Sequence, residues 1–266
     1  MRLAFIGGGN MGEAMLAAIL EKGLSIAENV TVSDISESRR LYLKQKYGII
    51  VTGDNRQSAV ESDVVVLAVK PQQLAEAMSG LSGRLHAAQM VLSIVAGAGI
   101  SALCRGLGHN CVVRVMPNTP AQIGEGISVW TATAEVSKEQ QAQASAILGA
   151  MGRQVHVADE RYLDMATAVS GSGPAYVFLF TEALTSAAVD IGLPDDIARE
   201  LALETVLGSA RFMQGSDSPP AELRRMVTSP GGTTAAALAC LEKGQFTELI
   251  KQAVRAAYER ARELGN

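Results

Sequence analysis

The sequence is poor in aromatic residues, in cysteine and in positive charge. Phe, Trp and Tyr together make up 4% of the 266 residues, so side chains on which nucleic-acid bases could stack are scarce. The formal net charge is −4, whereas surfaces that bind phosphate backbones usually carry an excess of Lys and Arg. The composition therefore argues against binding to nucleic acid.

The few cysteines and histidines are scattered along the chain. They are Cys104, Cys111, Cys240, His86, His109 and His156. No two cysteines form a C-x-x-C pair, and no two histidines have the spacing that places two ligands on one helix face. We therefore expect neither a disulfide framework nor a metal site.

Long apolar runs are also missing. The first apolar run, Leu3–Ile6, ends at Gly7 and is too short for the apolar region of a signal peptide. No later run approaches the length that spans a bilayer. We expect a protein that does not enter a membrane and that lies in the cytoplasm.

Hydrophobic residues are nevertheless plentiful, at 48% of the chain, and over residues 1–160 they form short runs that alternate with helical patterns. The runs are Leu3–Ile6, Val30–Ser33, Val64–Val69, Met90–Val95, Val112–Met116, Ile127–Trp130 and Val155–Val157. Continuous apolar runs of this length are typical of parallel strands buried on both faces. We predict an α/β domain over residues 1–160 with a doubly wound, Rossmann-type sheet.

The pattern becomes entirely helical over residues 161–266, which we predict to be a second domain. The predicted helices are Tyr162–Val169, Ala175–Ile191, Asp195–Gly215, Pro219–Val227, Thr233–Lys243 and Thr247–Leu264. Helix 175–191 is apolar around much of its circumference, so it needs a buried environment, for which a subunit interface is one candidate. We predict a homodimer through this domain, and an oligomer of such dimers stays open.

A glycine-rich segment, Gly7–Gly12, follows the first strand and precedes an apolar-periodic helix. Its G-x-G-x-x-G spacing in this context is typical of a dinucleotide site. Gly7 permits a tight turn, Gly9 lets the backbone approach the pyrophosphate, and Gly12 lets the helix pack closely on the sheet. The predicted cofactor-binding residues here are Ile6, Gly7, Gly8, Gly9, Asn10, Met11 and Gly12.

The end of the second strand bears on the choice between NAD and NADP. Asp34 lies about 20 residues beyond Gly12, where an acidic residue usually binds the ribose hydroxyls of NAD. Ser33 and Arg39 lie close by, and serines with an arginine can hold a 2′-phosphate instead. Arg39 and Arg40 fit a solvated helix face equally well, so the residues alone leave the choice open.

Further cofactor contacts are expected at Asn55 and over Ala68, Val69, Lys70 and Pro71. These residues lie at or just beyond strand ends, on the side where open α/β sheets bind ligands. Lys70 leaves a buried strand at this edge, which favours contact with the cofactor through its backbone and aliphatic stem.

The segment Ser229, Pro230, Gly231, Gly232, Thr233 and Thr234 precedes a predicted helix. The Pro-Gly-Gly sequence favours a turn, and the first N–H groups of the helix would then be available to an anion such as a carboxylate. The local pattern fits a simple capped helix equally well.

Five segments, taken together, resemble the pyrroline-5-carboxylate reductase family over nearly the whole chain. They are Ile6–Gly12, Ala68–Pro71, Met116–Pro120, Ser170–Tyr176 and Val227–Thr234, the last running on to Leu241 and Glu242. The resemblance implies a Rossmann domain, a helical domain that dimerises, and a substrate pocket at residues 229–234. It also implies hydride transfer from NAD(P)H to the cyclic imine 1-pyrroline-5-carboxylate, which gives L-proline as the last step of proline biosynthesis.

Two expectations depend on this resemblance. Thr234 is the candidate catalytic residue, since its hydroxyl could orient the substrate nitrogen. NADPH is the expected cofactor, with NADH also accepted, because Asp34 departs from the small or uncharged residue that NADPH-preferring relatives tend to carry.

Two other functions remain as alternatives. A β-hydroxyacid dehydrogenase of the same architecture would need a lysine on the first helix of the second domain, and residues 176–188 contain none. A non-catalytic dinucleotide-binding protein would have little use for an anion-binding turn at residues 229–234.

Overall fold

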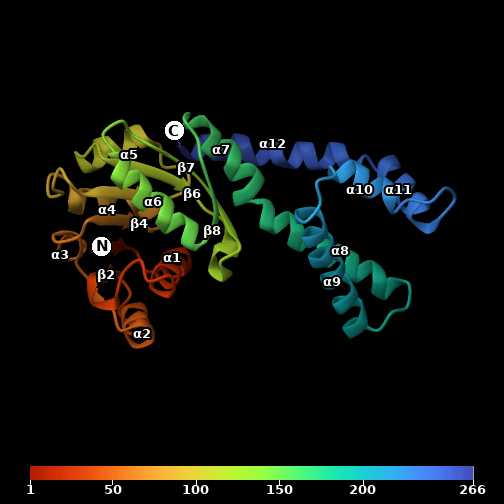
Figure 1. The fold of residues 1–266 in the computed structure, drawn as a ribbon, viewed down its shortest axis with the longest axis horizontal. Helices are drawn as coiled ribbons and strands as arrows, with labels where there is room; N and C mark the ends of the chain where they lie inside the picture. The colour runs from red at the N-terminus through yellow and green to blue at the C-terminus, as the bar shows by residue number, and fades with distance from the viewer. Residues whose placement is uncertain (266) are drawn as a thin grey trace. The chain divides into compact units, whose positions relative to one another are not determined.

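The computed structural model describes residues 1–265, and the chain forms two compact units. The first comprises Met1–Ser172 together with the chain from Ala257 on, and the second comprises Gly173–Ala256. In Figure 1 the first unit carries the sheet and the second is helical. The architecture predicted from the sequence, a Rossmann-type sheet followed by helices, is confirmed.

The first unit is built on one eight-stranded sheet with the order β3-β2-β1-β4-β5-β6-β7-β8. The strands are β1 Leu3–Ile6, β2 Val30–Ser33, β3 Ile50–Thr52, β4 Val64–Leu67, β5 Met90–Ser93, β6 Val112–Met116, β7 Gly126–Ala132 and β8 Gly152–His156. All neighbours pair in parallel except β6 with β7. The order of β3 to β6 is that of a dinucleotide-binding sheet.

Helices cover both faces of the sheet, as Figure 1 shows. Those of the first 156 residues are α1 Asn10–Glu21, α2 Glu37–Tyr47, α3 Asn55–Ala59, α4 Leu74–Leu81, α5 Ile100–Leu107 and α6 Lys138–Ala150. Alternate residues of β1 point to opposite faces: Phe5 belongs to one buried cluster and Ile6 to the other. Burial on both faces explains why the strands have continuous apolar runs.

Two strands differ from the sequence prediction. β3 was not predicted, because its apolar run is only the three residues Ile49–Val51. It lies at the sheet edge and leaves Ile50 exposed. β8 begins at Gly152, three residues before the predicted Val155. Its polar residues reflect its position at the other edge of the sheet.

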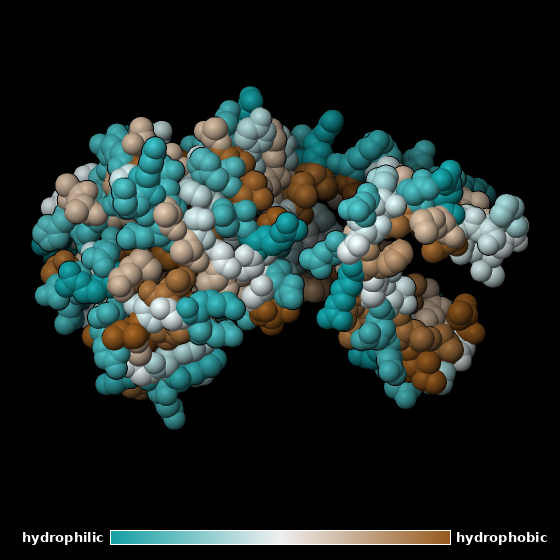
Figure 2. Space-filling model, viewed as in Figure 1, coloured by the Kyte–Doolittle hydropathy of each residue, from teal (hydrophilic) through white to brown (hydrophobic). Residues whose placement is uncertain are grey.

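The second unit contains most of the helical part of the chain. Its elements are α8 Gly173–Asp190, α9 Asp195–Gln214, α10 Pro220–Met226, α11 Thr233–Lys243 and the first half of α12 Phe246–Gly265. No residue of α8 is buried in the single chain, and Phe178 and Leu179 are 66% and 65% exposed. Figure 2 shows apolar residues gathered on the part of the surface where Figure 1 has α8 and α9. An apolar surface of this kind marks an interaction site.

The two units meet in sequence at a nearly continuous helical stretch. After α7, Arg161–Ala166, the chain forms one π-helical turn, Thr167–Gly171, and α8 begins at Gly173. The sequence Gly-Ser-Gly-Pro predicted a break, but Pro174 lies in the first turn of α8, where its missing N–H would have no partner in any case. The compact units divide after residue 172, and the predicted boundary at 160 stays a prediction.

None of the helices within the described residues has the length and apolar character that a membrane span needs.

Candidate cofactor and substrate sites

The glycine loop joins β1 to α1 in a tight turn that only glycine can form. Gly7 has φ +98°, and a Cβ on it would lie 2.7 Å from the carbonyl oxygen of Ala68. A Cβ on Gly12 would lie 2.8 Å from the carbonyl oxygen of Gly7, whereas nothing lies within 4 Å of the Cβ position of Gly9. The loop therefore has open space at Gly9, where a ligand can approach the backbone and the N-terminus of α1.

A cavity of about 410 Å³ opens at this loop, at the carboxyl ends of β1, β2 and β4. Eight of the predicted cofactor residues line it: Gly7, Gly9, Ser33, Asp34, Asn55, Ala68, Val69 and Lys70. The sequence prediction did not include Ile35, Ser36, Gln73, Glu76 and Ala77, which line it as well. The last three precede or begin α4 and carry no pattern of their own, so only the tertiary structure brings them to the cavity.

Other predicted cofactor residues do not line this cavity. They are Ile6, Gly8, Asn10, Met11, Gly12, Arg39 and Pro71. Ile6 is fully buried in the core, so its side chain supports the loop from beneath. A Cβ on Gly8 would lie 2.6 Å from Leu43 Cδ1, which shows that this glycine packs against α2. Asn10 and Met11 begin α1, where their backbone N–H groups could donate hydrogen bonds to a ligand.

Asp34 and Arg39 both contact the peptide groups of Gly8. The Gly8 N–H donates to Asp34 Oδ2 at 2.8 Å, and the Ser36 N–H donates to Asp34 Oδ1 at 2.8 Å. The Arg39 Nε–H donates to the carbonyl oxygen of Gly8. The sequence left two roles open for Arg39, a 2′-phosphate contact and a solvated helix face, and its contacts match neither, because its guanidinium group is directed to the protein.

A charged cluster on α1 and α2 holds Arg39 in this position. Glu13 accepts hydrogen bonds from Arg39, Lys46, Tyr42 and Tyr47. Burial raises the pKa of Glu13, but the hydrogen bonds from Lys46, Tyr47 and Arg39 outweigh it and lower the pKa to about 2. Glu13 is therefore ionised at neutral pH and joins the first turn of α1 to α2.

The side chains that line the cavity carry charges of both signs. Among the described lining residues Lys70 alone is cationic, and Asp34 and Glu76 are acidic. The Lys70 side chain has no hydrogen bond or ion pair to the described part of the chain, so its ammonium group is free to meet an anionic ligand. Asn55 also lines the cavity, and its Oδ1 accepts a hydrogen bond from the buried Ser33 hydroxyl at 2.7 Å.

In the second unit, residues 229–232 form a β-turn before α11. The Gly232 N–H donates to the carbonyl oxygen of Ser229 at 3.0 Å, and Gly231 has φ +72°. Proline followed by glycine with positive φ is the pattern of a type II turn. Since its N–H closes the turn, Gly232 cannot also donate this group to a substrate, which corrects one part of the predicted anion site.

The N-terminus of α11 is open. Gly232 is its N-cap residue, and no side chain among the described residues caps it. The N–H groups of Thr233 and Thr234 belong to the first turn, where a helix supplies no acceptor. Thr233 is exposed and Thr234 is half-buried, so the predicted residues of this segment do come together at a helix N-terminus.

A buried arginine that the sequence analysis did not single out supports the opposite part of the sheet. Arg114 in β6 is 6% exposed, and it donates to Glu160 Oε1 and Asp164 Oδ1 at 2.7 Å each. Glu160 also accepts from the Ile100 N–H at 2.7 Å. The signal that the sequence offered for this contact was a single arginine within an otherwise apolar strand. The ion pairs fasten α7 to the sheet.

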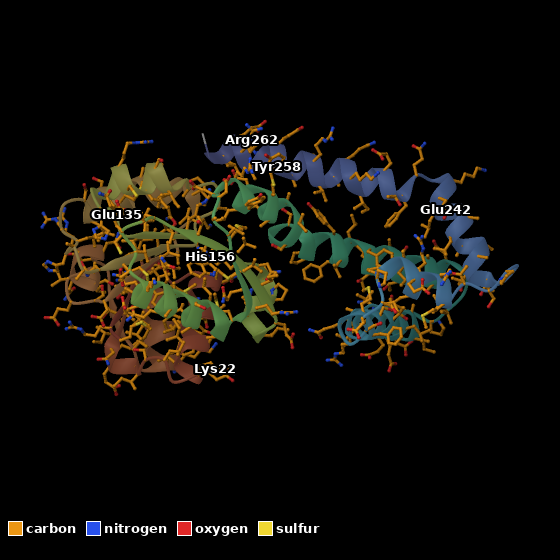
Figure 3. All side chains as sticks on the ribbon, turned by 45° about the horizontal axis from the view of Figure 1, so that its top comes forward. Lys22, Glu135, His156, Glu242, Tyr258 and Arg262 are labelled. Atoms are coloured by element: carbon orange, nitrogen blue, oxygen red, sulfur yellow. The ribbon has the colours of Figure 1, made fainter. Side chains whose placement is uncertain are left out.

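Two further side-chain contacts involve aromatic rings. Tyr258 and Arg262 lie together on α12, with the guanidinium 5.8 Å from the ring centroid (Figure 3). His156 packs against Trp130 with the ring centroids 4.5 Å apart. Within the described residues, no group of His, Cys, Asp and Glu side chains is arranged to hold a metal ion.

The mostly parallel sheet, the glycine loop and the cavity at its carboxyl edge define a protein of the dinucleotide-binding class. Two family models match: "NADP oxidoreductase coenzyme F420-dependent" over residues 2–97 and "Pyrroline-5-carboxylate reductase dimerisation" over residues 160–264. The dimerisation match covers the helices with the exposed apolar surface.

Full-length relatives identify the family. A pyrroline-5-carboxylate reductase from Synechocystis sp. is 43% identical, covering 100% of this chain and 98% of the relative. The solved reductase from Coxiella burnetii has a TM-score of 0.90 at 38% identity, covering 100% of this chain and 98% of that one. The Plasmodium falciparum enzyme, solved with NADP bound, has a TM-score of 0.91 at 32% identity over the same shares. The chain belongs to the pyrroline-5-carboxylate reductase family.

Proposed function

We propose that this protein reduces 1-pyrroline-5-carboxylate to L-proline with NADPH, the last step of proline biosynthesis. The observation that carries the proposal is full-length similarity to reductases of this name at about 40% identity. The two sites described above support it, because one chain carries both a dinucleotide cavity and an open helix N-terminus.

The cavity at the glycine loop fits a dinucleotide. Gly9 leaves open space at the N-terminus of α1, where backbone N–H groups would hold the pyrophosphate. Asp34, Asn55 and Val69 line the region where the adenosine end would lie. The bound nicotinamide would supply the hydride that reduces the C=N bond of the substrate.

The segment 229–234 is proposed to hold the substrate. Its carboxylate would accept hydrogen bonds from the N–H groups of Thr233 and Thr234, which stand at the positive end of α11. The hydroxyl of Thr234 would donate to, or accept from, the substrate near its nitrogen. Ser229, Pro230, Gly231 and Gly232 shape the turn that leaves this end open.

The reaction does not require a dedicated proton donor from the protein. A cyclic imine can bind already protonated, so that hydride transfer gives the neutral amine directly. The main task of these residues is then to hold the substrate in one orientation, which is where proximity lowers the barrier. Thr234 is proposed to orient the substrate rather than to transfer a full proton.

We further propose a homodimer formed through the helical unit. The match to a dimerisation family and the exposed apolar residues of α8 and α9 support it. Assembly of these dimers into larger oligomers, and a cytoplasmic location, remain predictions from the sequence.

An assay of purified protein tests the proposed function. Absorbance at 340 nm would follow oxidation of NADPH in the presence of 1-pyrroline-5-carboxylate, and chromatography would identify proline. A β-hydroxyacid assayed with NADP⁺, where absorbance at 340 nm would rise as NADPH forms, is the comparison, because that alternative shares the architecture. Nucleotide binding without turnover in either assay would instead favour the non-catalytic alternative.

A further inference from the structure

The peptide groups on both sides of Gly8 are held by side chains from the β2–α2 region. Asp34 Oδ2 accepts from the Gly8 N–H at 2.8 Å, and the Arg39 Nε–H donates to the Gly8 carbonyl oxygen. The preceding N–H, that of Gly7, donates to the Ser33 carbonyl oxygen at 2.8 Å. The middle of the glycine loop is thus fixed by three hydrogen bonds to one neighbouring segment.

Arg39 is itself held in place. Its Nη2 donates to Glu13 Oε2, its guanidinium lies 5.0 Å from the ring centroid of Tyr42, and its backbone N–H donates to the Ser36 hydroxyl. Two of the three guanidinium nitrogen atoms of Arg39, Nε and Nη2, therefore donate hydrogen bonds within the protein. The side chain is 24% exposed and does not line the cavity.

Packing leaves little freedom for the loop to move away from this arrangement. Gly8 is buried, and Leu43, which is fully buried on α2, occupies the space next to it. Because Gly9 follows directly, the orientation of the Gly8 peptide sets the direction of the next N–H groups, at the start of α1. Those are the groups that would face a pyrophosphate.

We propose that Arg39, together with Asp34, is a positioning residue that fixes the phosphate-binding face of the glycine loop, and that Arg39 does not select NADP over NAD. This inference rests on the proposed binding of a dinucleotide in the cavity. It predicts that loss of the Arg39 contacts weakens both nucleotides equally, because both carry the same pyrophosphate. An arginine bound to the 2′-phosphate would affect NADP alone.

The decisive variants are Arg39→Ala and Arg39→Lys. We expect Arg39→Ala to raise the Kd of NADP⁺ and of NAD⁺ by about tenfold each, the effect of losing one charge-assisted hydrogen bond, measured by calorimetry. Arg39→Lys keeps the charge but cannot reach Gly8 and Glu13 with a planar fork, so both Kd values should again rise together. Arg84→Ala, which removes an exposed arginine, should change neither Kd.

Hydrogen–deuterium exchange gives a second readout. In the ligand-free Arg39 variants, peptides that cover the glycine loop should exchange faster than in the wild type, whereas peptides from α5 should not. If Arg39→Ala does not fold, Arg39→Lys and Glu13→Gln, which removes the partner of Arg39, still test the idea.

Several results would overturn the inference. They are a rise in the Kd of NADP⁺ alone, retained NADP⁺ affinity in Arg39→Lys, or unchanged Kd values in both Arg39 variants. Wild-type protein that binds both nucleotides but does not reduce pyrroline-5-carboxylate would refute the proposed function and leave the inference standing. Wild-type protein that binds neither nucleotide would refute both.

Discussion

Replacement of Glu13 by Gln tests how strongly the cluster on α1 and α2 stabilises the sheet-bearing unit. The carboxyl pKa is lowered from 4.5 to about 2, and each pKa unit corresponds to about 1.4 kcal/mol. The Glu13 side chain is 15% exposed, but that of Lys46 is 48% exposed, and solvent screens this partner. We therefore expect Glu13→Gln to lower the free energy of unfolding at pH 7 by roughly 2–3 kcal/mol.

The same shift predicts a dependence on pH. Because the folded pKa lies below the unfolded one, the contribution is present in full above about pH 4.5 and is lost as the pH falls toward 2. The difference between wild type and Glu13→Gln should therefore shrink by about half between pH 7 and pH 3. Below that pH the two proteins should converge.

Urea unfolding at one fixed protein concentration measures this difference. Trp130 is the only tryptophan and is 4% exposed, so its fluorescence reports on the sheet-bearing unit. Glu21→Gln, an exposed position at the end of the same helix, is the matched control and should change stability by less than about 0.5 kcal/mol. An equal gap at pH 7 and pH 3, or no gap at pH 7, would refute the reasoning.

Three further predictions concern the two sites and the interface. Thr234→Ala should lower kcat/KM for pyrroline-5-carboxylate by about ten- to more than a hundredfold, since it removes a hydrogen bond of roughly 1.5–3 kcal/mol. Gly232→Val should lower it further, because the new Cβ would lie 3.2 Å from the Ser229 carbonyl oxygen. Normal turnover in both variants would place the substrate elsewhere. Asp34→Ser should raise the ratio of kcat/KM for NADPH to that for NADH, because it removes a negative charge from the cavity. An unchanged ratio would mean that Asp34 does not face the 2′ position of the adenosine ribose. Light scattering should detect no stable monomer, since α8 has no buried residue in the single chain, and a monodisperse active monomer would contradict this.

Local sequence patterns were sufficient for the architecture. The apolar runs predicted every strand of the sheet except β3, whose three residues at the edge include the exposed Ile50. The helices of residues 173–265 were predicted to within a few residues, because their periodicity and Pro-Gly boundaries are encoded locally. The glycine loop was predicted for the same reason: strand, spacing and helix lie next to one another in the chain.

Contacts between distant segments had to come from the tertiary structure. The sequence left Arg39 open between a 2′-phosphate contact and a solvated helix face, and the fold directs it to Glu13 and to the carbonyl oxygen of Gly8. Gln73, Glu76 and Ala77 line the cavity, where α4 is held by a buried cluster in which Ala77 joins Leu67 of β4. The sequence by itself thus determined the family, the sheet and the glycine loop, since each depends on neighbouring residues. The partners of each charged side chain depend on which segments the folded sheet brings together, and only the tertiary structure decided them.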